Sequence, residues 1–393
     1  MTPAAKKRWF DGLRLLLCVA ALWLVMRGVT LNDHVTLVAQ EQIKSGRVIE
    51  ISAEQITWEE PDGRRAQIPL AAIAADKHGR PLISYGLLTT WQNSRKELLL
   101  LAVLIHFPVI FLQAARFKWM VEAQRIALSY WESLKLSFAG NFLNFVTPLG
   151  SNAGDVFKAY FLALHTAQKT EAVTTVFLDR VVGLCTMVLV VAGITTFAPE
   201  SGPLVVLRPY IILMFWIGMV AMVAYFAPPL RRLIPAGWLD RLPMADQIRR
   251  IDGAAKTLIK EKRVVVACVL ITFLLQVWAI AAYFTVAVAL KMRADWSNIF
   301  DYYACFYSGV VVQSLPGPPQ GLGTVELTYR FFFDRFGSPS QIVCLAFGIR
   351  MVGLICALPG VLVTMTGAYR PKGAESGASS ENSGKQNLAP TRM

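Results

Sequence analysis

The hydrophobic positions of this chain gather into long, nearly unbroken runs. Several runs are near or above the length of about 20 residues that an α-helix needs to cross the hydrocarbon core of a bilayer. They cover residues 13–31, 98–112, 172–198, 210–227, 264–290 and 342–366. Hydrophobic residues make up 55% of the chain and charged residues only 17%. The pattern therefore predicts an all-α polytopic membrane protein rather than a soluble one.

The first run has a basic start, with Lys6, Lys7 and Arg8 ahead of it. No small-residue cleavage site stands out before Asn32, so the pattern favours an uncleaved helix over a signal peptide. We expect residues 1–31 to form a transmembrane helix whose N-terminus lies in the cytoplasm.

Residues 32–96 follow a different pattern. β-Branched and aromatic residues alternate with polar ones in 46–52, 55–60 and 65–70, and Pro61-Asp62-Gly63 separates two of these runs. Period-two alternation around such a turn is typical of β-hairpins. We predict a small extracytoplasmic β-domain of three to five strands. A domain of this size has a marginal core, so we expect it to rest on the membrane helices.

Basic residues are distributed unequally between the loops. Residues 228–263 hold nine Lys or Arg and four acidic residues, whereas residues 199–209 hold one Arg. The positive-inside rule places 228–263 in the cytoplasm and 199–209 outside. It also accounts for the net charge of +13 without nucleic acid as a partner. Docking of the basic loop onto anionic lipid is a further interpretation that the topology does not require.

The remaining composition indicates neither a cofactor nor a metal. The six cysteines all lie in apolar segments with no C-x-x-C pair, and the four histidines are scattered. This favours cysteines that act as small buried hydrophobes, and no zinc site is predicted. We expect residues 199–263 to form a connecting helix and a basic cytoplasmic loop. Residues 369–393 are polar and small, and we expect a disordered cytoplasmic tail.

Proline and glycine interrupt two further apolar segments, 134–168 and 298–336. The helix expected at 97–115 enters the cytoplasm, where Arg116, Lys118 and Arg125 follow it. Counting spans from the predicted topology makes the first segment begin and end in the cytoplasm and the second begin and end outside. Each is therefore predicted to be a re-entrant hairpin, and the two enter from opposite faces. The residues that break them are Pro148, Gly150 and Gly154 in the first hairpin and Pro319, Gly321 and Gly323 in the second.

The two breaks match in spacing. Asp155 follows Pro148 by seven residues, and Glu326 follows Pro319 by seven. An arginine comes 25 residues after Asp155 and another comes 24 residues after Glu326. Two halves of like order and opposite orientation, at 97–198 and 264–368, indicate an inverted repeat of helix, broken hairpin and helix. In such proteins discontinuous helices meet near the midplane and form the substrate site.

Asp155 and Glu326 fall in the first turn after each break. Helix capping is one interpretation of such residues. A carboxylate at membrane depth, however, is costly unless it is paired, so basic or polar partners are predicted. The partners are sought among Lys158, Asp179, Arg180 and Arg350, and we favour a polar functional cavity over purely structural pairing. The full set of candidate substrate-binding and translocation residues is Asn141, Asp155, Lys158, Asp179, Arg180, Gln313, Glu326 and Arg350.

These residues resemble the family of the lysylphosphatidylglycerol synthase transmembrane region, a family of flippase-like membrane proteins. The resemblance covers roughly residues 97–368. It departs from the family pattern at Ala153, Lys158 and Gln320, where the family often has Gly, Arg and Gly, and the β-domain at 32–96 is an addition. The motifs that carry it are, in order, Arg116-Phe-Lys-Trp119, Asn141 to Asp155-x-x-Lys158 with Pro148 and Gly154, Asp179-Arg180-x-x-Gly183, and Pro319-x-Gly321-x-Gly323-x-x-Glu326.

The resemblance implies a transporter of the cytoplasmic (inner) membrane that moves a lipid with a polar headgroup between leaflets. In the synthases, aminoacyl transfer belongs to a separate soluble domain, and only 24 residues follow Tyr369 here. We therefore expect no such enzyme activity.

In the leading hypothesis, Lys158, Arg180 and Arg350 neutralise an anionic headgroup. The carboxylates hold these bases in place, or receive a cationic headgroup or a coupling proton. No nucleotide-binding motif is present, so any energy comes from a gradient, a partner or downhill flow.

Two alternatives stay open. A membrane glycosyltransferase using a lipid-linked donor commonly has acidic residues in its first outer loop, where Asn32-Asp33-His34 stands. A scaffold for envelope assembly predicts that Asp155→Asn and Glu326→Gln leave function intact.

Overall fold

The computed structural model describes residues 30–37, 43–147, 152–197, 261–314 and 321–366, apart from gaps at 53, 61, 75–80, 82 and 167, and isolated positions elsewhere. The helices expected at 1–31 and 210–227, the basic loop and the tail lie mostly or wholly outside these residues. The hairpin residues Pro148, Gly150 and Pro319 lie outside them as well.

Four long apolar helical stretches form the body of the molecule, and they confirm the membrane class. A stretch of 28 residues rises about 42 Å, which is more than the hydrocarbon core of a bilayer. Each of the four is long and apolar enough to span a membrane: Lys96–Ala123, Lys169–Ile194, Lys262–Ala289 and Pro339–Ala357. These are the runs expected near 98–112, 172–198, 264–290 and 342–366.

Two of these stretches are interrupted by proline. The first consists of α3 (Lys96–His106) and α4 (Pro108–Ala123), and α15 (Pro339–Ala357) is followed by α16 (Pro359–Thr366). Proline has no amide hydrogen to donate to the preceding turn, so a helix breaks or bends there. The other two stretches are α7 (Lys169–Phe197) and α12 (Lys262–Ala289), and α12 packs against α3, α4 and α7.

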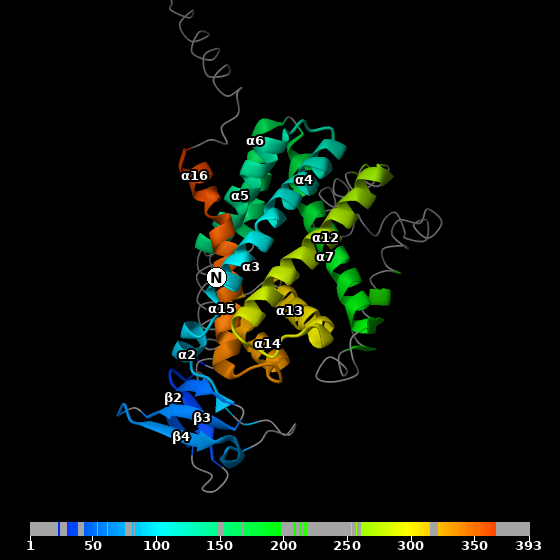
Figure 1. Cartoon of the computed structure of the whole chain (residues 1–393). Helices are drawn as coiled ribbons and strands as arrows, with labels where there is room; N and C mark the ends of the chain where they lie inside the picture. Colours follow the sequence, from blue (N-terminus) through cyan, green and yellow to red (C-terminus); the bar gives the residue numbers. More distant parts are fainter. Residues whose placement is uncertain are drawn as a thin grey trace, which may run out of the picture.

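Two pairs of shorter helices complete the body. The first pair is α5 (Tyr130–Val146) with α6 (Ala153–His165), and the second is α13 (Ile299–Ser314) with α14 (Thr324–Phe333). The first pair lies at the upper end of the helical body in Figure 1, and the second lies at the lower end, towards the sheet. With 13 and 10 residues, α6 and α14 rise only about 20 Å and 15 Å.

Glycines allow close approach within the first pair. A Cβ atom on Gly154 would lie 2.4 Å from the carbonyl oxygen of Gly140 on the facing helix. In the second pair, Gly309 leaves room for the ring of Tyr329, which a Cβ atom would meet at 2.2 Å. Since real Cβ atoms do not approach other atoms this closely, both helix pairs need glycine at the crossing.

The sheet predicted after the first run is present. Strands β1 (Asp33–Thr36), β2 (Ile43–Ile51), β3 (Gln55–Glu59), β4 (Arg65–Pro69) and β5 (Ile83–Ser84) form a five-stranded antiparallel sheet in the order β4-β3-β2-β1-β5. Its core centres on Trp58, Ile56 and Val35, all fully buried. Gly63, with φ of 83°, lies in the turn between β3 and β4.

The sheet is fixed to the end of the helical body through a short helix and a buried carboxylate. A one-turn 3₁₀ helix (Leu70–Ala72) follows β4, and α2 (Leu87–Gln92) leads from β5 into α3. Asp33 is fully buried and accepts hydrogen bonds from the amides of Val48 at 2.7 Å and Gly86 at 2.6 Å. The hydroxyl of Ser338 donates to the carbonyl of Tyr85 at 3.1 Å, which ties the sheet to α15.

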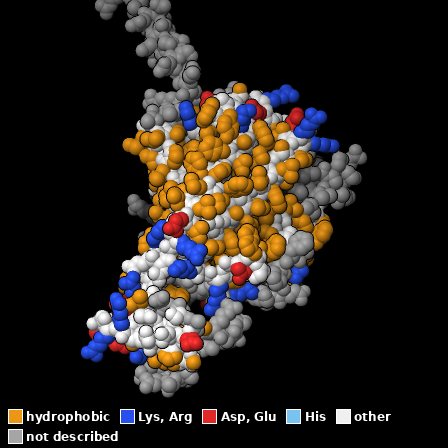
Figure 2. All heavy atoms as spheres, viewed as in Figure 1, with side chains coloured by type: hydrophobic (Ala, Val, Ile, Leu, Met, Phe, Trp, Pro, Cys, Tyr) orange, Lys and Arg blue, Asp and Glu red, His pale blue; other side chains and the backbone are white. Residues whose placement is uncertain are grey.

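The outer surface of the helical body is a broad apolar belt. Figure 2 shows hydrophobic side chains over its middle, and Lys, Arg and acidic side chains mostly at its two ends. Large exposed hydrophobic residues include Leu100, Leu104, Leu270 and Phe273, on α3 and α12. Such a patch on a soluble monomer would be an interaction surface. On helices of this length it is the face that lipid covers.

One expectation about α4 was wrong. The sequence pattern ended this helix near residue 115 and made Arg116 a cytoplasmic flank. The helix instead continues to Ala123, and Arg116 lies inside it with a side chain that is 13% exposed. An acidic partner on another helix lets this arginine remain in the interior.

Candidate functional site

A bidentate ion pair joins α4 to α7. The guanidinium of Arg116 lies against the carboxylate of Asp179, with Nε 2.8 Å from Oδ1 and Nη2 2.9 Å from Oδ2. Of these two contacts, the one from Nη2 to Oδ2 is a hydrogen bond, and Nη1 donates a second hydrogen bond, to the hydroxyl of Thr272 on α12 at 3.1 Å. One guanidinium therefore joins three long helices.

The next residue on α7, Arg180, has a different partner. Successive residues on a helix point about 100° apart, so Asp179 and Arg180 face different neighbours. Nε of Arg180 contacts Oδ2 of Asp155, the third residue of α6. The side chain of Asn144 on α5 accepts a hydrogen bond from the amide of Gly154 at 2.7 Å, which caps the first turn of α6. Arg180 is 43% exposed, so this pair is the wetter of the two.

Lys158 lies one turn further along α6. Its Nζ is 4.8 Å from the centre of the Phe117 ring, a cation–π contact. Among the residues that the structure describes, no carboxylate oxygen lies within ion-pairing distance of this Nζ. A protonated Lys158 therefore has an aromatic ring beside it, whereas Arg116 and Arg180 each have a carboxylate.

Another ion pair, which is buried, belongs to the second helix pair. Glu326, the third residue of α14, is fully buried and lies against Arg350 of α15, with Oε1 2.8 Å from Nη1 and Oε2 3.3 Å from Nη2. Oε2 also accepts a hydrogen bond from the amide of Gly323 at 2.8 Å. Gly323 and Gly321 have φ angles of 85° and 62°, in the left-handed region that glycine adopts readily.

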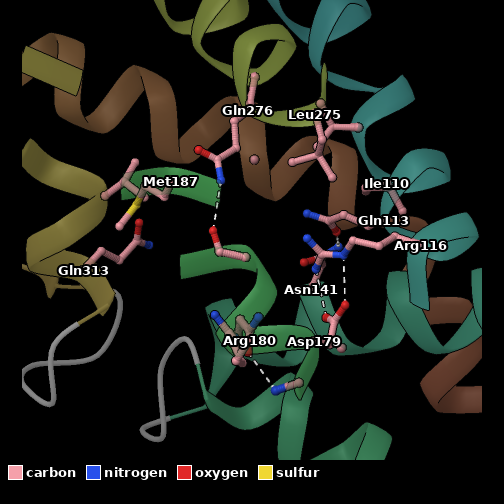
Figure 3. Close-up of a pocket in the computed structure, with 18 of the residues that line it drawn as sticks. Ile110, Gln113, Arg116, Asn141, Asp179, Arg180, Met187, Leu275, Gln276 and Gln313 are labelled. Atoms are coloured by element: carbon pink, nitrogen blue, oxygen red, sulfur yellow. Dashed lines mark hydrogen bonds and ion pairs between the residues drawn. The ribbon is translucent and has the colours of Figure 1, made fainter. Parts of the chain in front are cut away.

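The space between these groups is a cavity of about 350 Å³. The end of α5, the start of α6, the C-terminal half of α13, and parts of α4, α7 and α12 line it (Figure 3). Arg116, Lys158 and Arg180 contribute three basic groups, and Asp155 and Asp179 contribute two acidic ones. In their ordinary ionised forms these side chains leave the lining with one excess positive charge. Apolar residues of α4, α7 and α12 also line it: Val109, Ile110, Leu184, Met187, Leu275 and Ile280.

A smaller cavity of about 60 Å³ continues towards the second helix pair. It shares Gln313, Tyr283 and Gly353 with the larger one, and Arg350 lines it. The ends of both helix pairs that lie nearest their breaks therefore line two neighbouring cavities.

The candidate residues named from the sequence fall into three positions. Glu326 lies behind Arg350 and lines neither cavity. Arg350 lines the smaller cavity. The larger cavity is lined by Asn141, Asp155, Lys158, Asp179, Arg180 and Gln313, and also by Gly154 of the first break.

The sequence reasoning missed several residues of the lining. Arg116 entered only as part of a family motif and as a flanking charge. Gln113, Asn144 and Gln276 were not named, although each also lines the larger cavity. Their signal was present, because a carboxamide inside an apolar run is itself costly in a membrane and marks a bundle interior.

Asp33, the acidic residue on which the glycosyltransferase alternative was based, has a structural role. Asp33 is buried in β1 and its two oxygens accept hydrogen bonds from two backbone amides. Burial, together with the nearby Asp33 carboxylate, raises the pKa of the Tyr85 hydroxyl. Asp33 therefore belongs to the junction between the sheet and α2, away from both cavities.

The long apolar helices and the charged interior define a polytopic membrane protein with a polar cavity inside its bundle. Comparison with known families gives one match: the lysylphosphatidylglycerol synthase TM region matches residues 86–360, more than half of the chain. The chain belongs to this family, as the sequence motifs indicated, and the match begins at Gly86, after the five strands of the sheet. No match to the chain is found among curated proteins.

Membership of this family makes the chain a membrane protein of lipid or envelope metabolism. The matched region is a membrane domain, which is consistent with a transporter-like role. The residues of the cavity and of the three ion pairs all lie within the matched range.

Proposed function

We propose that this protein moves a phospholipid with an anionic headgroup between the two leaflets of the cytoplasmic membrane. The observation that carries the proposal is the charge balance of the cavity. Two arginines there are held by carboxylates, while Lys158 has no carboxylate at ion-pairing distance among the described residues. A phosphate diester near its Nζ would supply the missing counter-charge.

The ion pairs prepare the cavity for this task. An isolated charge inside a membrane protein is costly. When no lipid is bound, Asp179, Asp155 and Glu326 would neutralise the three arginines, and Lys158 would keep its contact with an aromatic ring. Once a phosphate enters, Lys158 and the more exposed Arg180 would be free to turn towards it, while the bidentate Arg116–Asp179 pair keeps α4, α7 and α12 in place.

We further propose that the two helix pairs are re-entrant hairpins of an inverted repeat. Asp155 and Glu326 each occupy the third position of a short helix after a break, and each contacts an arginine on the long helix that follows. Helices α6 and α14 are both too short to span a bilayer on their own. In this arrangement the first hairpin opens to the cytoplasm and the second to the outside, with the N- and C-termini cytoplasmic.

Irregular backbone at membrane depth is tolerated where protein or a water-filled cavity meets it. The helix ends next to the two breaks line the cavities, at Phe145 and Gly154 in the first pair and at Gln313 and Val325 in the second, which supports this arrangement. Rocking one hairpin against the other would expose the cavity to each face in turn. The apolar side chains of its wall would then accompany the acyl chains.

A leaflet-exchange assay tests the proposed function. The purified full chain is reconstituted into vesicles with a fluorescent phospholipid, and the fraction of label accessible to a membrane-impermeant quencher is followed over time. We expect exchange well above that of protein-free vesicles for the wild type, and slower exchange for Asp155→Asn, Glu326→Gln and Arg350→Ala. Equal exchange by all four proteins would contradict the site. An envelope scaffold without transport activity would give no exchange above protein-free vesicles.

A further inference from the structure

Five carboxamide side chains line the larger cavity. They come from four helices, α4, α5, α12 and α13, and they share the wall with the charged groups. The five are Gln113, Asn141, Asn144, Gln276 and Gln313. Four of them are labelled in Figure 3, where they border the space between α4, α7, α12 and α13. This number of neutral donors and acceptors is more than an anion alone needs.

Part of their hydrogen-bonding capacity holds helices together. Nδ2 of Asn141 donates to Oε1 of Gln113 at 2.9 Å, which joins α5 to α4. Nε2 of Gln276 donates to the carbonyl of Gly183 at 3.2 Å, which joins α12 to α7. Carboxamides commonly hold helices together inside membranes in this way. In this role each amide uses either its NH₂ donor or its oxygen acceptor, and not both.

The remaining hydrogen-bonding group of Gln113, Asn141 and Gln276 is available. Oε1 of Gln276 is buried and has no hydrogen-bond partner among the described residues. Oδ1 of Asn141 and the amide nitrogen of Gln113 likewise have no partner there. A polar atom left without a partner in a low-dielectric interior is unfavourable, so a ligand that pairs with it gains affinity. The available atoms include both donors and acceptors.

A neutral hydroxyl group is matched to such a mixture. A hydroxyl donates one hydrogen bond and accepts others, as a carboxamide does, whereas an ammonium only donates and a phosphate only accepts. A wall of carboxamides therefore complements a row of hydroxyl groups. Asp155 and Asp179, the carboxylates of the lining, are both paired with arginines, so among the described residues a cationic headgroup finds no carboxylate without a basic partner there.

The size of the cavity agrees with a polyol attached to a phosphate. A volume of 350 Å³ equals that of about twelve water molecules in the liquid, at about 30 Å³ each. This is room for a phosphate together with three to six hydroxylated carbons. It is also at the lower end of the volumes of small-molecule sites, which begin at about 300 Å³.

We propose that the lipid carries a neutral polyhydroxylated headgroup, such as glycerol, inositol or a sugar, attached through its phosphate. Lys158 contacts the phosphate, and Gln113, Asn141 and Gln276 bind the hydroxyls. This inference rests on the proposed translocation of an anionic lipid and adds to it the chemistry of the headgroup.

A matched pair of lipids tests the inference. Phosphatidylglycerol and phosphatidylpropanol have the same charge and nearly the same size, and they differ only in two hydroxyl groups. We expect the wild type to exchange labelled phosphatidylglycerol about five to thirty times faster, since each hydroxyl would be held by one hydrogen bond. In Gln276→Leu and in Asn141→Leu this ratio should fall about two- to fivefold. Gln92→Leu, outside the cavity, is the control and should keep it.

The ratio of two rates in one preparation does not depend on how much protein has folded, so loss of folded protein cannot imitate the result. A wild-type ratio near one, or a ratio that both cavity variants leave unchanged, would overturn the inference.

A binding measurement separates this inference from the proposed transport. Dihexanoyl phosphatidylglycerol should raise the thermal unfolding temperature of the wild type in detergent more than dihexanoyl phosphatidylpropanol does. If this difference is found but neither labelled lipid exchanges, the translocation is refuted and the headgroup chemistry stands. If exchange occurs without any preference between the two lipids, the headgroup chemistry is refuted and the translocation stands.

Discussion

Replacing Glu326 by glutamine isolates the effect of one buried charge. The glutamate is fully buried, contacts Arg350 at 2.8 Å and 3.3 Å, and accepts the amide of Gly323 at 2.8 Å. Glutamine can still accept that amide hydrogen, so the cap is kept. What is lost is the counter-charge of Arg350, whose side chain is only 15% exposed. Removing one member of a buried pair destabilises a protein by about 3–5 kcal/mol.

The arginine left behind accounts for most of this cost. A second variant that also replaces Arg350 by methionine should therefore recover a large part of the loss. The assay is unfolding of the purified protein in detergent, followed by tryptophan fluorescence for all members of the double-mutant cycle. We expect Glu326→Gln to unfold several degrees lower than the wild type and the double variant to lie between them.

The exposed pair of Lys118 and Glu122, 2.6 Å apart, provides the matched control. Because solvent screens this pair, Glu122→Gln should cost at most about 0.5 kcal/mol. If Glu326→Gln is no more destabilising than Glu122→Gln, or if the double variant is the least stable of the set, then the buried pair does not act as we have reasoned.

Three further predictions follow from other contacts. Gly154→Val should prevent stable folding of the first helix pair, because its Cβ would lie 2.4 Å from a backbone oxygen. Gly193→Ala, with nothing within 4 Å of the added Cβ, is the control and should be neutral or stabilising. Yield and size-exclusion profile in detergent compare the two variants, and equal profiles would contradict the contact. Asp33→Ala should leave the amides of Val48 and Gly86 without an acceptor, at a cost of about 1–3 kcal/mol in folding free energy. The sheet should then be more sensitive to limited proteolysis, and resistance equal to that of the wild type would contradict this role of Asp33. Reporters fused near residues 60 and 245 should report opposite sides of the membrane, and a common side would refute the proposed topology.

Much of this architecture could be predicted because its causes are local. The length of an apolar run predicts a spanning helix, the alternation in β3 and β4 predicts strands with one buried face, and Pro61-Asp62-Gly63 predicts a turn. Carboxylates in the first turn after a break follow from helix capping and from the amides exposed there. Asp155 and Glu326 could therefore be named with the arginines at 180 and 350, which the structure places against them.

The partner of Asp179 could not be predicted in the same way. Arg116 is 63 residues away in the sequence, on a helix whose end was predicted too early. Charge alone made it look like the usual basic flank of a membrane helix. Which of two adjacent residues on α7 faces which neighbour depends on how α4, α6 and α12 pack around it. The irregularity of the β2–β3 pairing between Val48 and Glu50 is equally a product of packing.

The break between α3 and α4 was not anticipated, although Pro108 signals it. The apolar run continues across it, and hydropathy does not register a change of helix direction. His106 at this point is buried, lines the larger cavity and stacks on Tyr283 at 5.6 Å between ring centres. The interruption therefore places a polar ring on the wall of the cavity, which periodicity alone does not reveal.

The most direct test of the central claim compares charge with size at position 158. Exchange of labelled phosphatidylglycerol and of a labelled glycosyl diacylglycerol, which has hydroxyl groups but no phosphate, is measured in parallel for the wild type, Lys158→Met and Lys158→Arg in vesicles of the same composition. Our account predicts that Lys158→Met slows phosphatidylglycerol at least tenfold relative to the phosphate-free lipid, because a charge-assisted contact of about 1.5–3 kcal/mol with the phosphate is lost. It predicts that Lys158→Arg retains most of the preference. If the ratio of the two rates is the same in all three proteins, Lys158 does not bind the headgroup and the account is contradicted.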